Sequence, residues 1–356
     1  MKTTADYIAS GFEKIDADLA NLMNCLHEVL CDLGAKDAAA HLPWQNQGEV
    51  HNISAPPEGI EQAYSIAFQL LNMVEENAAA RTRRLREIEH GLDAEPGLWG
   101  RQLSHLKAAG FSGKDIAAFL PSVRIEPVFT AHPTEAKRPA VLEQHRAIFR
   151  LLVSQEDPAL TPSERAATHD EIKVVLERLW HTGEILLEKP TVASERRGMT
   201  FYLCEVLPAA LEQLDNRLRS AWSAAGFDEA LLADPKVWPR VRFGSWVGGD
   251  RDGHPFVTAE VTKDTLADLR HHALGVLSRQ LTDLATKLPL SGNFQKTPRA
   301  LKAALTTLRE SHPVTADILA RQYPDEPWRQ YVLLLKAGLP IDGHPDDGTT
   351  YQNPTA

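Results

Sequence analysis

The feature that most constrains the fold of this chain is the glycine-rich stretch Gly244-Ser-Trp-Val-Gly-Gly-Asp-Arg-Asp-Gly-His-Pro255. It follows the run 240–243, whose alternating polar and apolar residues predict a short strand with one apolar face. The glycines let the backbone turn sharply and approach a ligand closely. A strand that ends in such a loop predicts a cradle for a phosphate or carboxylate, because backbone N–H groups and the guanidinium of Arg251 both favour anions.

Four side chains on this loop have two interpretations. Trp246, Asp250, Arg251 and Asp252 lie where a bare turn has little use for them, which favours a ligand site. The alternative is a tight turn in which the two aspartates and the arginine pair only with one another. The spacing alone does not decide between these interpretations.

A second turn of the same type occurs in Ile125-Glu-Pro-Val-Phe-Thr-Ala-His-Pro-Thr134. Its apolar residues predict a short strand that Pro127 interrupts, and Lys137 and Arg138 open the helix that follows. His132 therefore lies on a strand-to-helix turn. Because the pKa of an unperturbed histidine lies near neutrality, His132 is a candidate general base. Taken alone, however, one of 14 histidines is more often a hydrogen-bonded structural residue.

The rest of the chain predicts a mainly helical protein, because apolar residues recur at steps of three and four. The stripe at 8–33 indicates a core seam, with a partner-binding face as the alternative. Thr161-Pro-Ser-Glu164 predicts a helix start with a capping box, and Pro208 predicts a kink. We expect further helices at 60–90, 99–109, 113–120, 137–152, 161–187, 194–225, 258–288, 298–310, 314–322 and 326–337.

Composition excludes several classes of function. The hydrophobic fraction of 43% and charged fraction of 24% are ordinary for a soluble globular protein. The net charge of -10 argues against a nucleic-acid partner, although local arginines still permit an anionic substrate. No apolar run approaches the length of a membrane span, and three cysteines without metal spacing suit reduced thiols. We therefore expect a cytoplasmic protein with no membrane partner.

Two segments of the chain, Phe129–Arg138 and Gly244–Thr258, resemble signatures of the phosphoenolpyruvate carboxylase family. The resemblance continues, in the family's order and rough spacing, at 68–76, 179–185 and 326–329. It implies a mainly α fold with a few short β-strands, in which a partial (β/α) barrel is surrounded by helices. Units of strand, loop and helix place their loops at one end of such a barrel. We therefore expect His132 and Arg251 to lie near each other, on loops that open toward the same side.

The resemblance also implies a reaction, the carboxylation of phosphoenolpyruvate by bicarbonate to oxaloacetate and phosphate with a divalent metal, usually Mg²⁺. It assigns the role of base near the carboxyl group to His132. Arg251 is expected to stabilise charge on the phosphoryl oxygens, which need fixed donors. The family commonly assembles as homotetramers. Further substrate-binding residues are expected at Arg138, Trp246, Gly248, Gly249 and Asp250, with Trp246 as an apolar wall.

The resemblance is limited to residues 1–339, which we interpret as the N-terminal region of this fold. The family's acidic metal ligands, catalytic lysine and second phosphate loop have no counterpart between Gly253 and Ala356. We therefore expect no metal ligands in this chain and apolar faces left exposed by an incomplete barrel. The chain is either active with a C-terminal portion supplied in trans as a partner, or a member of the family that is inactive alone. Residues 340–356 are polar and are expected to be a disordered tail. The alternative hypothesis is a non-catalytic helical protein that retains an anion pocket or a partner-binding surface.

Overall fold

The structure is a computed structural model that describes residues 3–44, 59–130, 138–183, 191–252 and 255–341. The chain forms two compact units. The first unit comprises residues 1–191 and 212–244, and the second comprises residues 192–211 and 245–356. Each unit is described by itself below. The expected disordered tail lies outside the described residues, apart from its first two positions.

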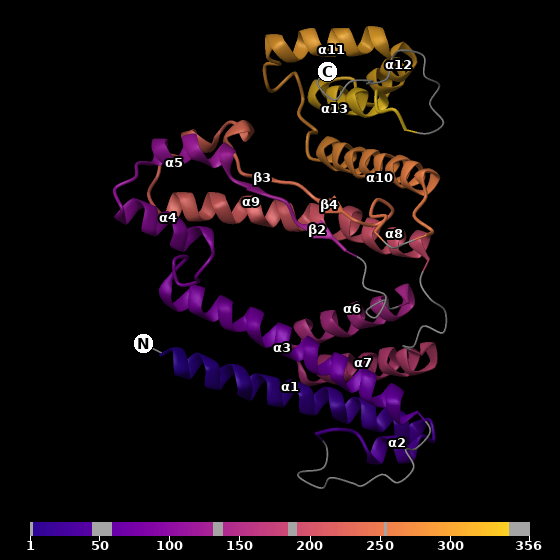
Figure 1. Ribbon diagram of the computed structural model, residues 1–356. Helices are drawn as coiled ribbons and strands as arrows, with labels where there is room; N and C mark the ends of the chain where they lie inside the picture. The colour runs from indigo at the N-terminus through magenta and orange to yellow at the C-terminus, as the bar shows by residue number, and fades with distance from the viewer. Residues whose placement is uncertain (1–2, 45–58, 131–137, 184–190, 253–254, 342–356) are drawn as a thin grey trace. The chain divides into compact units, whose positions relative to one another are not determined.

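The largest core of the first unit lies among a group of helices that are coloured indigo to magenta in Figure 1. Buried side chains of α1 pack against α3 and α7, and α6 packs against α7. These helices are α1 (Thr4–Asp32), α2 (Lys36–Ala40), α3 (Ile60–His90), α6 (Pro139–Ser154) and α7 (Pro162–Thr182). The predicted core seam is confirmed from Ile15 onward, whereas Ile8 and Phe12 of the same stripe are 56% and 60% exposed.

The buried thiol of Cys25 gives this core a predictable pH dependence. Its burial, together with the nearby charge of Glu28, raises the pKa of Cys25 from 9.0 to about 11. A raised pKa in the folded state stabilises the fold at low pH, and that stability is lost as the pH rises through this window. We expect the free energy of unfolding to fall by roughly 2 kcal/mol between pH 9 and pH 11.

Denaturant titrations at several pH values would measure this loss, with Cys25→Ala as the control. The alanine variant starts from a lower stability because it loses buried volume, but its alkaline loss should be smaller. An equal loss in both proteins would contradict the assignment to Cys25.

A second core of the first unit surrounds the fully buried Trp222. Its indole N–H donates to the carbonyl of Asp228 at 2.9 Å, which holds the connector 226–238 against the helix. The elements around it are α4 (Trp99–Ala108), α5 (Gly113–Phe119), η1 (Leu120–Ser122), the last turns of α9 (Leu207–Ala224), η4 (Glu229–Leu232) and η5 (Pro235–Val237). The connector thus contains two short 3₁₀ turns.

Four two-residue strands complete the first unit. They are β1 (Arg124–Ile125), β2 (Val128–Phe129), β3 (Arg240–Val241) and β4 (Gly244–Ser245), the last of which ends in the second unit. β1 pairs with β3 in parallel, and β2 pairs with β4. The expectation of a mainly helical fold with a few short strands is confirmed for the described residues.

The predicted end of α7 was wrong by about five residues. The sequence pattern extends to Leu187, but the helix ends at Thr182 because Gly183 takes a positive φ of 70° at its C-terminus. Glycine is the residue that adopts this left-handed conformation at low cost, and it commonly ends helices. The start of α7 is as predicted, with reciprocal hydrogen bonds between Thr161 and Glu164.

The second unit contains α8 (Val192–Phe201), the start of α9, α10 (Ala259–Thr286), α11 (Arg299–Ser311), α12 (Pro313–Gln322) and α13 (Pro327–Ala337). α13 packs against both α10 and α11. The expected kink at Pro208 is a π-helical turn over Tyr202–Val206. Because Pro208 has no N–H, the carbonyl of Cys204 lacks its usual helical donor. Nη2 of Arg279 on α10 donates to that carbonyl at 3.0 Å instead.

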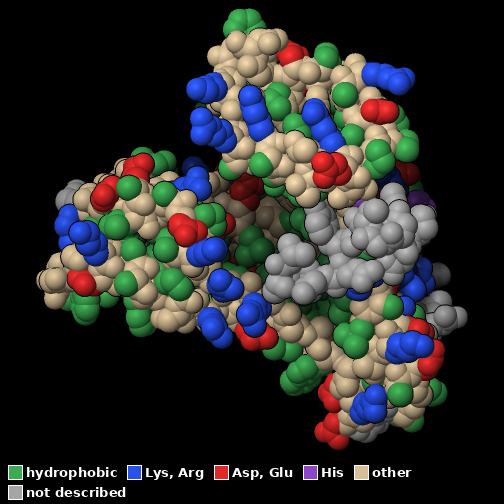
Figure 2. All heavy atoms as spheres, turned by 90° about the horizontal axis from the view of Figure 1, so that it is seen from above, with side chains coloured by type: hydrophobic (Ala, Val, Ile, Leu, Met, Phe, Trp, Pro, Cys, Tyr) green, Lys and Arg blue, Asp and Glu red, His purple; other side chains and the backbone are tan. Residues whose placement is uncertain are grey.

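Apolar side chains are exposed in both units. Ile125 and Val128 on the strands are 49% and 48% exposed, and Phe256 and Phe294 are 73% and 95% exposed. Figure 2 shows hydrophobic side chains scattered among acidic and basic ones over the face in view. Among the described helices, none is both long and apolar enough to cross a membrane.

Candidate functional site

The strands that precede the two predicted turns pair with each other, β1 with β3 and β2 with β4. The pairing of β1 with β3 is parallel, with Arg124 opposite Arg240 and Ile125 opposite Val241. The ladder bonds run from the N–H groups of Arg240, Arg242 and Gly244 to the carbonyls of Val123, Ile125 and Pro127, at 3.1, 2.9 and 3.0 Å. Because the strands are parallel, the chain leaves both of them in the same direction. His132 follows the first strand but lies outside the described residues, so its predicted closeness to Arg251 stays a prediction.

The glycine-rich loop is held by its own backbone. The carbonyl of Trp246 accepts the N–H groups of Gly249 and Asp250, at 3.0 and 2.8 Å. Ser245 Oγ accepts the N–H of Val247 at 3.0 Å. The N–H of Gly249, which is expected to bind an anion, is therefore already used inside the turn. Side chains of the loop remain as donors for a ligand.

Arg251 is exposed on this loop. Asp250 Oδ1 accepts the backbone N–H of Asp252 at 3.0 Å, but in the described part of the chain no salt bridge joins Arg251 to either aspartate. This geometry does not support the alternative in which the three charges only pair with one another. It leaves the guanidinium of Arg251 accessible to an anion. The side chain of Trp246 is 57% exposed and equally accessible.

Gly248 is the residue that seats the loop on α10. It has a φ of +74°, and a Cβ atom at this position would lie 2.2 Å from Oγ1 of Thr265. Thr265 is buried, with 3% of its surface exposed. Neither the conformation nor the space admits a side chain, so Gly248 is required by the structure of the loop. A Cβ at Gly249 would meet only the carbonyl oxygen of Trp246, at 3.9 Å.

Arg138, also expected to bind substrate, lies at the start of α6 in the first unit. Its Nη1 donates to the carbonyl of Thr182 at 3.3 Å, at the end of α7. A cation at this position also compensates the partial negative charge of a helix C-terminus. The contact observed for Arg138 is therefore one between two helices.

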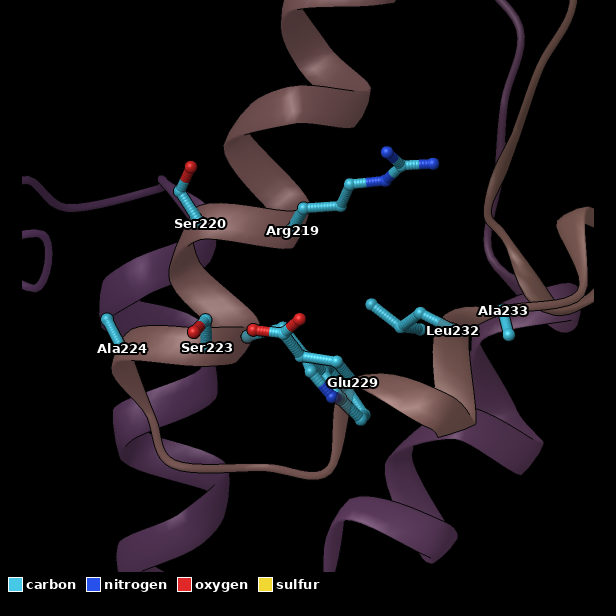
Figure 3. A pocket seen from close by; sticks show the side chains of 8 residues that line it. Arg219, Ser220, Ser223, Ala224, Glu229, Leu232 and Ala233 are labelled. Atoms are coloured by element: carbon cyan, nitrogen blue, oxygen red, sulfur yellow. The ribbon is translucent and has the colours of Figure 1, made fainter. Parts of the chain in front are cut away.

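A surface pocket of about 700 Å³ lies in the first unit, and none of the predicted site residues lines it. Figure 3 shows Arg219 extending from α9 over the space between this helix and Leu232. The guanidinium carbon of Arg219 lies 4.9 Å from the ring centre of Trp238, a cation–π contact. No sequence pattern indicated this pocket, because its walls come from separate elements, α9 and the region of η4.

No three His, Cys, Asp or Glu side chains within the described residues are grouped as a metal ion requires. The Mg²⁺ that the family resemblance implies thus has no three-residue ligand group within the described ranges.

Comparison with known proteins places these observations in a family. The family model described as phosphoenolpyruvate carboxylase matches residues 50–341. A phosphoenolpyruvate carboxylase of Methylorubrum extorquens is 37% identical over 279 residues, which are 76% of this chain and 29% of that relative. One of Xanthomonas euvesicatoria is 34% identical over 284 residues, 79% of this chain and 31% of the relative. The chain thus spans less than a third of the length of these relatives.

Proposed function

Because the chain belongs to the phosphoenolpyruvate carboxylase family, we propose that it serves the carboxylation of phosphoenolpyruvate by bicarbonate to oxaloacetate and phosphate. The observation that carries this proposal is the parallel ladder of 123–127 with 240–244. The strands that precede both signature segments run in the same direction, as do the strands of a (β/α) barrel, whose active-site loops lie at one end. We propose that the strands belong to a partial barrel of this kind.

The residues have separate roles in the proposed reaction. An oxygen of bicarbonate attacks the phosphoryl group, which leaves the enolate of pyruvate and forms carboxyphosphate. His132 acts as the base near the carboxyl group of carboxyphosphate and assists its breakdown into CO₂ and phosphate. The enolate carbon then attacks this CO₂ to form oxaloacetate. The exposed guanidinium of Arg251 binds a phosphoryl oxygen, and Trp246 forms an apolar wall beside the methylene group.

The partners and the metal follow from the family. When bound, Mg²⁺ would neutralise phosphoryl charge in such a reaction, and the described residues provide no group of three possible ligands for it. We propose that residues 1–339 form the N-terminal region of the family fold. Assembly with a further portion of such a protein, and into homotetramers, belongs to the same proposal.

Ligand binding tests the role of Arg251. Calorimetric titration of phosphoenolpyruvate into the protein should detect weak binding that Arg251→Gln reduces about 10- to 100-fold. This range corresponds to the loss of a hydrogen bond to a charged group, about 1.5–3 kcal/mol. His132→Ala should bind phosphoenolpyruvate almost as well as the wild type, because the proposed base assists the release of CO₂ and does not bind the phosphoryl group.

Arg270→Gln is the matched control, since Arg270 is an exposed arginine on α10. If Arg251→Gln and Arg270→Gln weaken binding to the same small degree, the effect is one of net charge and the loop is not the anion site. If binding depends on Arg251 but no catalytic assembly forms, the alternative of a non-catalytic anion-binding protein gains support.

A further inference from the structure

The glycine-rich loop rests on a single buried side chain. The backbone of Gly248 lies so close to Thr265 that an added Cβ would be 2.2 Å from its Oγ1, 2.9 Å from its Cβ and 3.0 Å from its Cγ2. All three side-chain heavy atoms of Thr265 therefore face the loop. Because protein interiors are densely packed, a change in the position of this side chain changes the position of the loop.

Two hydrogen bonds fix the rotamer of Thr265. Its Oγ1 donates to the carbonyl of Val261 at 2.7 Å, one turn earlier in α10. The same oxygen accepts a hydrogen bond from Nη1 of Arg196 at 3.3 Å. The hydroxyl thus has both a donor and an acceptor partner, which leaves it one orientation.

Arg196 reaches this position from a different helix, α8, and is itself held by a second partner. Its Nε lies 3.0 Å from Oδ2 of Asp268 in a salt bridge whose side chains are 21% and 30% exposed. Thr265 and Asp268 are three residues apart on α10 and so share one face of this helix. A planar guanidinium can bridge both, whereas an ammonium group offers no such fork.

We propose that Arg196 is a positioning residue of the glycine-rich loop: it orients Thr265, on which Gly248 rests, and thereby places Arg251 for its anion. The expected effect on anion binding rests on the proposed function. The link from Arg196 through Thr265 to the loop rests on the distances alone. Among the described residues, no hydrogen bond or salt bridge joins Arg196 to the loop backbone or to Arg251. Its effect on binding must therefore be indirect.

Amide hydrogen exchange of the full chain tests the mechanical link. In Arg196→Lys and Thr265→Val, exchange in the loop peptide 245–252 should rise about three- to tenfold, as expected when one hydrogen bond that holds a closed state is lost. Thr265→Ser keeps the hydroxyl and should resemble the wild type. Arg197→Lys is the matched control, because Arg197 is an exposed neighbour on the same helix.

Binding of inorganic phosphate, measured on the same proteins, connects the loop to the proposed function. Arg196→Lys should weaken it about three- to tenfold, while Thr265→Ser and Arg197→Lys leave it unchanged. If even the wild type binds no phosphate but loop exchange responds as expected, the proposed function fails and the positioning role stands.

Three results would overturn the positioning role. One is unchanged loop exchange in folded Arg196→Lys and Thr265→Val. Another is exchange that rises equally in α13 and the loop, which would mean a general loss of stability. The third is failure of both variants to fold, which would assign the network to overall stability rather than to the loop.

Discussion

A polypeptide of these 356 residues is expected to form no measurable oxaloacetate from phosphoenolpyruvate and bicarbonate, even with Mg²⁺ present. Loss of one electrostatic donor from an active site lowers the rate about 10²- to 10³-fold. The family resemblance leads us to expect that the acidic metal ligands, the catalytic lysine and the second phosphate loop are not among these residues, so the expected loss involves several such groups together. Because groups that act as a unit do not contribute additively, their combined effect is not a product of single losses.

The measurement is an oxaloacetate assay coupled to a second enzyme, on pure protein with a His132→Ala variant as the control. A second arm adds a polypeptide that comprises the portion of the Methylorubrum extorquens relative beyond its match to this chain. Activity in this arm that His132→Ala abolishes would support a site shared between polypeptides. Turnover by the 356-residue chain alone that disappears in His132→Ala would contradict our expectation and show that the chain is a complete catalyst.

Local signals made most of the helices predictable. The expected helix over 60–90 coincides with α3 (Ile60–His90), and at the start of the helix expected over 258–288 the side chain of Thr258 accepts the N–H of Val261 at 3.3 Å. Caps and apolar periodicity act within a few residues of the chain, so the sequence contains them in full. The same holds for the interruption of the first strand at Pro127, between β1 and β2.

Contacts between distant segments were not predictable in this way. The pattern at Pro208 indicates a kink, but the structure has a π-helical turn there, and Arg279, 75 residues away, donates to the carbonyl of Cys204. The apolar stripe of α1 includes Phe12, yet only its later turns find a packing partner in the core. Such outcomes depend on which surfaces meet, and periodicity along one helix does not contain that information.

In the candidate site, too, local features were predictable and contacts between distant segments were not. Chain pattern and family resemblance together point to the loop and to Arg251, and the glycine at 248 follows from the need for a sharp turn. Its supporting residues, Thr265 and Arg196, gave no signal, because a threonine and an arginine inside helices are ordinary there. For Arg138 the resemblance predicts more than the structure shows. The residue lies in a signature segment, but its observed hydrogen-bond partner is a carbonyl at the end of a helix.

The glycine-rich loop should tolerate a methyl group at Gly249 but not at Gly248. At Gly248 an alanine would keep an unfavourable positive φ, which costs about 1–2 kcal/mol. It would also overlap Thr265, and overpacking of this kind costs about 1–3 kcal/mol. We expect Gly248→Ala to lower the free energy of unfolding by roughly 2–4 kcal/mol and to abolish phosphate binding.

Gly249→Ala is the matched control on the neighbouring residue. Its φ is not in the left-handed region, and the nearest atom to an added Cβ is the Trp246 carbonyl oxygen at 3.9 Å. Substitutions of exposed residues without such constraints change stability by about 0.5 kcal/mol or less. Denaturant unfolding of both variants measures the difference directly.

The double variant Gly248→Ala/Thr265→Ala separates the two causes, because removal of the threonine side chain relieves the overlap but not the backbone strain. We expect it to be more stable than the sum of the two single losses predicts, with a coupling energy of about 1–2 kcal/mol. Equal stabilities of Gly248→Ala and Gly249→Ala would mean that the loop does not rest on Thr265. Arg196 could then not position Arg251 through Thr265, and the proposed positioning role would be wrong.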